Sequence, residues 1–499
     1  MNSIQGLLNG FSNVVTPTNL SFTFIGCLLG TIIGVLPGLG PVATMALLLP
    51  LTYKISSPTT TVVMMAGIYY GAMYGGSTTS ILLNIPGEAA SVITCIDGHE
   101  MAKQGKAGPA LGIAAIGSFI AGTISVIGLT FVAPPLAEIA LKFGPAEYFS
   151  LATLGLVLAT YLISGKSVIK GFIMVIFGLF LGTIGLDPVS GSMRFTLDIP
   201  ALYGGIDFVT LAMGFFGIAE MLTNLEKQES IQVIATKIGR IYPTLKEWAD
   251  SLMAILRGSF VGFFLGILPG GGGVMASLLS YALEKRLSRH PERFGKGAIE
   301  GVAAPESANN AGATSSFIPL LTLGIPGNTS IAMIFAVLLI AGIQPGPFLI
   351  VEHPEVFWSV IASMYIGNVM LLALNLPLIG LWVQLLKIPY SLLATIISLL
   401  CLIGVYSVQN NIFDVIFMII FGVVGYLLRK FDFEAGPLLL AFVLGPICER
   451  SLVRALMISE GKISVFLTRP ISAVMLSITA ILVVLSVIDS IKRSKSQNM

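Results

Sequence analysis

The chain has 499 residues, of which 55% are hydrophobic and only 10% are charged, and its mean hydropathy is +0.92. Soluble domains carry about 25% charged residues, so this chain cannot cover a water-facing surface of its own size, and a soluble fold is excluded. The net charge of +2 gives no indication of nucleic-acid binding. The composition therefore predicts an all-α polytopic membrane protein surrounded by a lipid bilayer.

Apolar runs recur along the whole chain, each close to the about 20 residues that cross a bilayer. The clearest runs are residues 111–132, 149–163, 168–184, 208–221, 357–381, 392–408, 412–428 and 471–488. With the interrupted runs included, we expect about 11 to 13 membrane segments, some of them re-entrant.

The first interruption is the stretch GVLPGLGP at residues 34–41, inside an apolar run. Proline and glycine cost about 3 and 1 kcal/mol relative to alanine in a helix interior, and irregular backbone in a bilayer needs protein or a water-filled cavity beside it. A glycine-lined break lets a ligand approach the main chain, and the following helix points N–H groups at an anion. A tight helix crossing would use the same residues. We expect a substrate site here, with Gly38 and Gly40.

The next polar segment, residues 73–91, is rich in hydroxyl groups and ends at Pro86 and Gly87. Residues 306–330 share these features, and we expect both segments to form helix–break–helix hairpins that dip into the membrane. Hydroxyl and amide groups can bind a carboxylate or, with freed carbonyls, Na⁺, although they also bond back to their own helices. The candidate substrate-binding side chains are Thr78, Thr79, Ser80, Asn84, Asn309, Asn310, Ser315, Ser316, Asn328 and Thr329.

Two carboxylates lie within these polar segments, and intramembrane carboxylates indicate function by default. We therefore expect Glu306 and Glu88, together with Asn310, to couple transport to a cation, although a structural hydrogen bond is the alternative for Glu306. Apart from Na⁺ or H⁺ as a coupling ion, the sequence predicts no metal and no cofactor, because its cysteines and histidines match no metal-ligand spacing.

The second half of the chain repeats the features of the first. GFFLGILPGGG at residues 262–272 matches GTIIGVLPGLG at residues 30–40 in five Gly and Pro positions, which adds Gly270 and Gly272 to the expected site. Residues 284–296 hold five Lys or Arg where their counterpart 51–60 has one. Residues 98–106 hold two where their counterpart 342–357 has none. Because Lys and Arg favour the cytoplasmic side, we expect two inverted repeats, an architecture of many secondary transporters.

These features divide the chain into four parts. Residues 1–222 form the first transmembrane repeat, 223–250 a cytoplasmic polar linker, 251–470 the second repeat, and 471–499 a C-terminal transmembrane helix with a basic tail. A short apolar stretch at residues 437–447 would either cross the membrane or only dip into it.

Long motifs give the chain a resemblance to a known family. They are the paired GxxxGxxPGxG motifs, YGGSTTSILLNIPGEAASVITCIDGHEMAKQGKAGPAL at residues 74–111, and PESANNAGATSSFIPLLTLGIPGNTSIAM at residues 305–333, followed by GIQPGP. With these motifs the chain resembles the large membrane subunit of the tripartite tricarboxylate transporter family. One departure is the all-glycine run at residues 270–273.

The resemblance implies a multi-pass permease of the bacterial inner membrane that works with a small membrane subunit and a periplasmic solute-binding protein. It also implies uptake of citrate-like or other carboxylates driven by an ion gradient, commonly of Na⁺. The leading hypothesis is therefore a cation-coupled secondary carboxylate importer, with elevator-like movement and a rocking bundle as the two alternatives for its mechanism.

Two other classes compete with this hypothesis. A channel-like or gated pore subunit for small organic anions would conduct ions without saturation. A membrane enzyme is disfavoured, because the sequence has no HExxH, GxSxG, Cys/His pair or phosphate-binding loop. The same absence argues against ATP hydrolysis by this chain.

Overall fold

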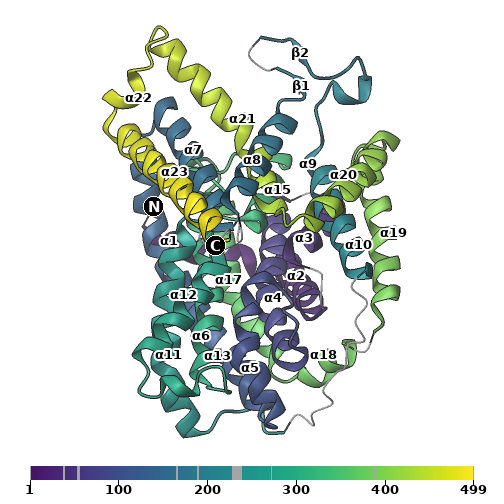
Figure 1. Cartoon of the computed structure of the whole chain (residues 1–499), viewed down its shortest axis with the longest axis vertical. Coiled ribbons are helices and arrows are strands. Elements are labelled where there is room, and N and C mark those ends of the chain that lie inside the picture. The colour runs from purple at the N-terminus through teal and green to yellow at the C-terminus, as the bar shows by residue number, and fades with distance from the viewer. Residues whose placement is uncertain are drawn as a thin grey trace.

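The computed structural model of the chain describes residues 2–36, 40–52, 55, 57–163, 167–187, 190–226, 239–270, 272–386 and 388–497. This part of the chain is predominantly helical, with a single two-stranded hairpin (Figure 1). The all-α architecture expected from the composition is therefore confirmed.

In chain order, the helices and strands divide into those of the first half and those of the second half of the chain. The first half holds α1 (Ser3–Val14), α2 (Pro17–Val35), α3 (Pro41–Thr52), α4 (Pro58–Leu83), η1 (Ala89–Val92), α5 (Thr94–Lys103), α6 (Ala107–Ala140), α7 (Pro145–Ile163), α8 (Val168–Gly182), β1 (Gly185–Leu186), β2 (Met193–Arg194), η2 (Pro200–Leu202), α9 (Phe208–Ala212), the π-helix η3 (Met213–Ile218) and α10 (Ala219–Glu226). The second half holds α11 (Leu245–Ile267), α12 (Gly272–Leu287), η4 (Pro291–Arg293), α13 (Glu300–Ser315), α14 (Phe317–Leu323), α15 (Thr329–Ile340), α16 (Leu349–Glu352), α17 (Pro354–Asn375), α18 (Ile379–Leu385), α19 (Tyr390–Gln409), α20 (Ile412–Lys430), α21 (Ala435–Ile458), α22 (Val465–Thr468) and α23 (Pro470–Gln497).

Helix starts follow the local sequence. α4 and α17 begin with proline, whose missing N–H is not needed in the first turn. The Asp207 carboxylate caps α9 by accepting hydrogen bonds from the N–H groups of Val209 and Thr210. At α11, Thr244 and Glu247 form a reciprocal capping box.

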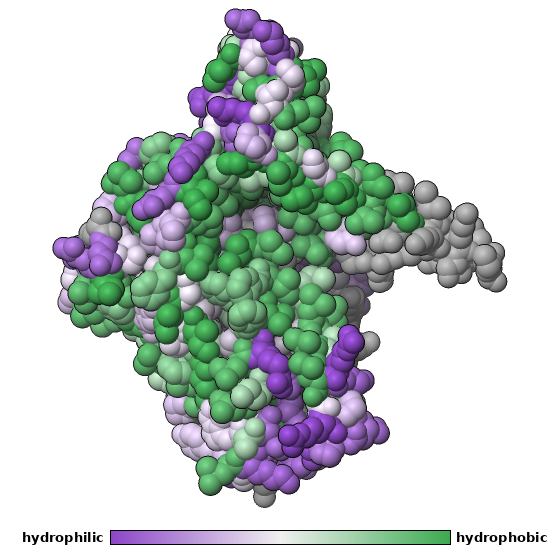
Figure 2. All heavy atoms as spheres, turned by 90° about the vertical axis from the view of Figure 1, so that its left-hand side faces the viewer, coloured by the Kyte–Doolittle hydropathy of each residue, from purple (hydrophilic) through white to green (hydrophobic). Residues whose placement is uncertain are grey.

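Eight helices of the described part are long and apolar enough to cross a membrane, and four shorter apolar helices accompany them. The eight are fewer than the roughly 11 to 13 membrane segments expected from the sequence, a number that included interrupted and re-entrant segments. In Figure 2 apolar residues cover most of the middle of one face, and hydrophilic residues gather towards both ends of the long axis. The chain is a multi-pass membrane protein.

The two halves share a close helix contact built on glycines at every fourth position. A Cβ at Gly26 or Gly30 of α2 would lie 2.2 or 2.4 Å from the carbonyl oxygen of Met64 or Ile68 in α4. In the second half, a Cβ at Gly258 or Gly262 of α11 would lie 2.5 or 2.2 Å from the oxygen of Ala304 or Ala308 in α13. Only glycine permits this backbone approach, and both pairs use the same spacing, as a duplicated unit would.

Three basic loops lie together at one end of the molecule, the lower end in Figure 1. They are the loop after α5, the loop before α13, and residues 239–244 of the linker. The Gln104 side chain donates a hydrogen bond to the Lys296 carbonyl, which joins the loop after α5 to the loop before α13. The Arg240 carbonyl of the linker lies against Gly108 at the start of α6. The β1–β2 hairpin, in which Gly185 pairs with Arg194, lies at the opposite end (Figure 1).

The structure gives the form of two segments, one that the sequence left open and one that it predicted otherwise. The stretch at residues 437–447 belongs to the 24-residue helix α21, which continues through Pro446 and is long enough to cross a membrane. Residues 73–83, expected to begin a separate hairpin, are instead the last part of the 26-residue helix α4. This helix runs without interruption from the apolar residues before them. Of the expected linker at residues 223–250, α10 takes the start and α11 the end, and residues 227–238 lie outside the described part.

Candidate functional site

Both predicted glycine breaks interrupt the helices. α2 ends at Val35 and α3 begins at Pro41, while Gly38 lies outside the described residues. α11 ends at Ile267 and α12 begins at Gly272. Between them Gly270 has a φ of +79°, a left-handed conformation that glycine adopts without steric cost.

A second pair of breaks follows α4 and α14. Each helix ends at a residue in the left-handed conformation, Asn84 with a φ of 57° and Gly324 with a φ of 69°. Asn and Gly are the two residues that most readily take this position at a helix end. Asn84, an expected substrate ligand, therefore terminates α4, and its side chain is exposed.

The breaks of the second half touch each other. The N–H of Gly270 donates a hydrogen bond of 2.6 Å to the Gly327 carbonyl. A Cβ at Gly272 would lie 4.0 Å from the Cβ of Asn328. We call Glu88, Gly270, Gly272, Asn309, Gly327 and Asn328 the break cluster, since the residues of both halves meet here.

Glu88 connects the first half to this cluster. Its Oε2 accepts a hydrogen bond from the N–H of Ala90 at 2.7 Å, which caps η1. Its Oε1 accepts one from Nδ2 of Asn309 in α13 at 2.9 Å. Both side chains are buried, and a Cβ at Gly273 would lie 2.2 Å from the Asn309 Oδ1. The start of α12 therefore abuts this contact.

Glu306 lies one turn before Asn309 on α13 and is completely buried. Thr94, the first residue of α5, donates a short hydrogen bond to its Oε1. Glu306 Oε2 and Asn309 Oδ1 have no hydrogen-bond partner among the described residues. No Lys, Arg or His of the described chain forms an ion pair with Glu88 or Glu306. An isolated buried carboxylate is costly unless it is neutralised.

Asn328 begins the other side of the cluster. Its Oδ1 accepts a hydrogen bond from the Ile331 N–H at 2.9 Å and so caps α15. Its Nδ2 donates to the Tyr69 hydroxyl at 3.0 Å. Asn328 and Thr329 are half-buried, as is Gly272, so the N-termini of α15 and α12 are partly accessible beside one another.

Other expected ligands bond within or between helices. The Thr79 hydroxyl donates to the Val35 carbonyl at 2.8 Å, and Ser80 donates to Gly76 of its own helix. Asn310 donates to Ser118 Oγ of α6 at 2.7 Å. The hydroxyls of Ser315 and Ser316 bond back to carbonyls of α13, and Thr78 is buried within α4. Gly40 directly precedes α3, with open space where a Cβ would be.

Three residues of these networks were not singled out from the sequence: Tyr69, Thr94 and Ser118. Tyr69 lies within an apolar run, and Ser118 is a lone hydroxyl in the 34-residue helix α6. Thr94 follows the polar segment by three residues and is the one that this proximity could have indicated. No group of three or more His, Cys, Asp and Glu side chains forms a metal site in the described part of the chain.

In a multi-pass membrane protein, helices that are broken at a buried polar cluster are typical of transporters. Residues 20–440 match the model of a transporter family, so the chain belongs to the tripartite tricarboxylate transporter TctA family. This is a family of transporters and not of enzymes. Its tripartite organisation implies two partner proteins for the permease, a periplasmic binding protein and a small membrane subunit.

Two proteins of Agrobacterium vitis are similar to the chain. One, named "Uncharacterized 52.8 kDa protein in TAR-I ttuC' 3'region", is 49% identical over 497 residues, covering 100% of this chain and 99% of that protein. The other, "Uncharacterized protein in TAR-II ttuC' 3'region", is 52% identical over 236 residues, covering 47% of this chain and 98% of that protein. No solved structure matches the chain.

Proposed function

We propose that this chain is the permease subunit of a binding-protein-dependent, cation-coupled secondary transporter that imports tricarboxylates or related carboxylates across the bacterial inner membrane. The observation that carries the proposal is the pair of buried carboxylates Glu88 and Glu306. Each is hydrogen-bonded to a polar side chain of the other half, and neither forms an ion pair within the described chain.

Coupling to a cation follows from the charge of this site. A buried carboxylate must be protonated or accompanied by a cation. Glu306 Oε2 and Asn309 Oδ1 are both buried and without a hydrogen-bond partner in the described part of the chain, and they are neighbours on one helix face. Two such oxygens suit a proton on Glu306 or a Na⁺ ion between them, and Glu88 and Asn310 adjoin the same turns of α13.

Recognition of an anionic substrate is supported by the helix ends. α12 and α15 begin beside each other at half-buried Gly272 and Asn328. The N-terminus of a helix favours negative charge through its free N–H groups and its dipole. The carboxylate is therefore held by backbone N–H, amide and hydroxyl groups, and the coupled cation balances its charge.

The inverted arrangement of the halves is supported by contacts along α4 and α13. Early in α4 the Tyr70 ring lies 6.5 Å from that of Phe317, which begins α14 directly after the end of α13. Further along α4 the Ile81 side chain lies beside Gly98, which also lies near Val302 at the start of α13. α4 and α13 therefore run in opposite directions past one another. We propose that the helices on the two sides of the breaks after α4 and α14 form re-entrant hairpins, and that these hairpins move together in an elevator-like step.

The test is uptake of labelled citrate and other carboxylates by proteoliposomes that hold this chain and its small membrane subunit, with the binding protein outside. Uptake should require an inward Na⁺ or H⁺ gradient. Glu306→Gln should abolish accumulation, while Glu460→Gln, at an exposed position, should behave as wild type. Absence of gradient-dependent uptake across the carboxylate panel would refute coupled transport, and conductance without saturation would indicate a pore.

A further inference from the structure

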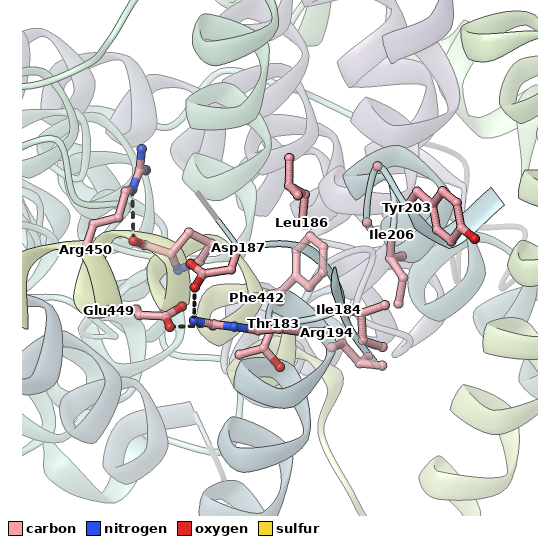
Figure 3. Close-up of a pocket in the computed structure, with 15 residues that line it drawn as sticks. Thr183, Ile184, Leu186, Asp187, Arg194, Tyr203, Ile206, Phe442, Glu449 and Arg450 are labelled. Atoms are coloured by element: carbon pink, nitrogen blue, oxygen red, sulfur yellow. Dashed lines mark hydrogen bonds and ion pairs between the residues drawn. The ribbon is translucent and has the colours of Figure 1, made fainter. Parts of the chain in front are cut away.

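A second polar site, a cavity, is lined by residues between 181 and 206 and between 442 and 450, none of which belongs to the break cluster. This half-open cavity of about 440 Å³ is formed by the end of α8, residues 183–187, Arg194, residues 203–206 and α21 (Figure 3). It belongs to the end of the molecule that carries the β1–β2 hairpin, opposite the three basic loops (Figure 1). Its volume lies within the range of about 300–1,000 Å³ typical of small-molecule sites.

Arg194 of β2 lies between two carboxylates on the wall of this cavity (Figure 3). Its Nη2 is 2.7 Å from Asp187 Oδ2, and its Nη1 is 2.5 Å from Glu449 Oε1. The Asp187 side chain is 4% exposed, whereas that of Glu449 is 36% exposed. Because an ion pair weakens with exposure to water, Asp187 holds the guanidinium in place and Glu449 is the exchangeable partner.

The charge of this wall is fixed by neighbouring groups. The hydrogen bond to Glu449 and the negative charge of that carboxylate, and after them the contact with Asp187, raise the pKa of Arg194, so the guanidinium stays protonated. Arg450 also lines the cavity, where its Nε donates a hydrogen bond of 3.0 Å to the Pro446 carbonyl. This bond leaves the terminal nitrogens of Arg450 available. Guanidinium groups bind carboxylates through paired hydrogen bonds.

We propose that this cavity is a receiving site for a small di- or tricarboxylate, in which a carboxylate of the solute takes the place of Glu449 on Arg194. Asp187 is then a positioning residue, Arg450 binds a second carboxylate, and Glu449 is a built-in competitor that returns when the solute leaves. The inference rests on the proposed function and adds to it a first binding step outside the membrane core.

The experiment measures binding of citrate, succinate and acetate to the purified full chain by titration calorimetry, separately from transport. Arg194→Gln should weaken citrate binding about tenfold, as loss of a charge-assisted hydrogen bond does. Glu449→Gln should tighten binding several-fold, because the competing charge is gone. Arg454→Gln, one turn further along α21 and exposed, removes the same charge outside the cavity and should leave the affinity unchanged.

The opposite signs of the two variants distinguish a binding site from a structural ion pair, whose loss would weaken binding in both. Unchanged affinity in Arg194→Gln, or weaker affinity in Glu449→Gln, overturns the proposal. Should Arg194→Gln unfold, Arg194→Lys keeps the charge beside Asp187 and should still lower the affinity. Wild-type transport with citrate affinity insensitive to both residues refutes this site alone, whereas absence of both binding and uptake refutes the proposed function with it.

Discussion

Nδ2 of Asn309 in α13 donates a hydrogen bond of 2.9 Å to Oε1 of Glu88, across 221 positions of sequence. This contact joins the polar segment of one half to that of the other, and both side chains are buried. It also places the start of α12 against η1, because Gly273 packs on the Asn309 amide. The two halves are therefore connected where the break after α4 meets the middle of α13.

Replacing Asn309 by Leu should reduce both stability and transport. The change leaves the buried Glu88 Oε1 without its donor, which costs about 1–3 kcal/mol. Thermal unfolding in detergent should occur at lower temperature, and uptake by the folded fraction should fall at least tenfold. The control is Asn375→Leu in α17, a buried asparagine whose hydrogen bond within the described residues goes to Leu371 of its own helix. If the folded Asn309→Leu variant took up substrate as fast as Asn375→Leu, the hydrogen bond between Asn309 and Glu88 would be dispensable for transport.

Substitution of Gly262 should separate α11 from α13. A Cβ there would lie 2.2 Å from the Ala308 carbonyl oxygen, and such overpacking costs about 1–3 kcal/mol. The free energy of unfolding of Gly262→Ala, measured by denaturant titration, should fall by this amount.

Gly380→Ala in α18 is the matched control, because a Cβ there has nothing within 4 Å. It should be neutral or stabilise α18 by up to about 1 kcal/mol, the helix-propensity difference between the residues. A stable Gly262→Ala variant would mean that the two helices can move apart without loss.

The Arg257–Glu284 pair should stabilise the hairpin of α11 and α12. Arg257 reaches both carboxylate oxygens, at 2.8 and 2.6 Å, and the Glu284 side chain is 4% exposed. Glu284→Gln should therefore lower the free energy of unfolding by about 1–3 kcal/mol. This is below the cost of breaking a fully buried pair, since Arg257 is 36% exposed. Glu100→Gln, in the exposed pair with Lys103, should leave the stability unchanged.

The two ends of the molecule should face opposite sides of the membrane. Ser192→Cys in the β1–β2 hairpin and Lys296→Cys in a basic loop both place a thiol at an exposed position, in a background with Cys448 replaced by Ala. A membrane-impermeant maleimide should label position 192 in intact spheroplasts and position 296 only after permeabilisation. Labelling of both from one side would contradict the assignment of the basic loops to the cytoplasm.

Local rules predicted the interruptions of the helices well. Proline and glycine at residues 36–40 and 268–272 are unfavourable inside a helix, and α2 and α11 end directly before these residues. The same rules misjudged residues 73–83, where hydroxyl groups and glycines continue α4. Gly75 packs against α2, because a Cβ there would lie 2.5 Å from the Thr31 carbonyl oxygen, and Gly76 packs against Glu88. Glycine in a membrane helix therefore marked a contact there and a break elsewhere.

The partners of the site residues could not be predicted from spacing alone. Glu306 was expected to be functional, but its bond to Thr94 depends on how α5 packs against α13, which local sequence does not encode. The cavity at Arg194 was missed for a similar reason. Glu449 and Arg450 follow the short apolar stretch at residues 437–447, and only the continuation of α21 through Pro446, which carries them to the end of α8, shows that they line a cavity.

The most direct test of the central claim compares exchange with accumulation in the Glu306→Gln variant. If this carboxylate carries the coupling cation, its neutral replacement should still exchange labelled for unlabelled carboxylate across proteoliposomes loaded on both sides. It should fail to accumulate the solute against its gradient when Na⁺ or H⁺ is supplied outside. Accumulation by Glu306→Gln to the wild-type level, with the same dependence on the cation gradient, would contradict the account.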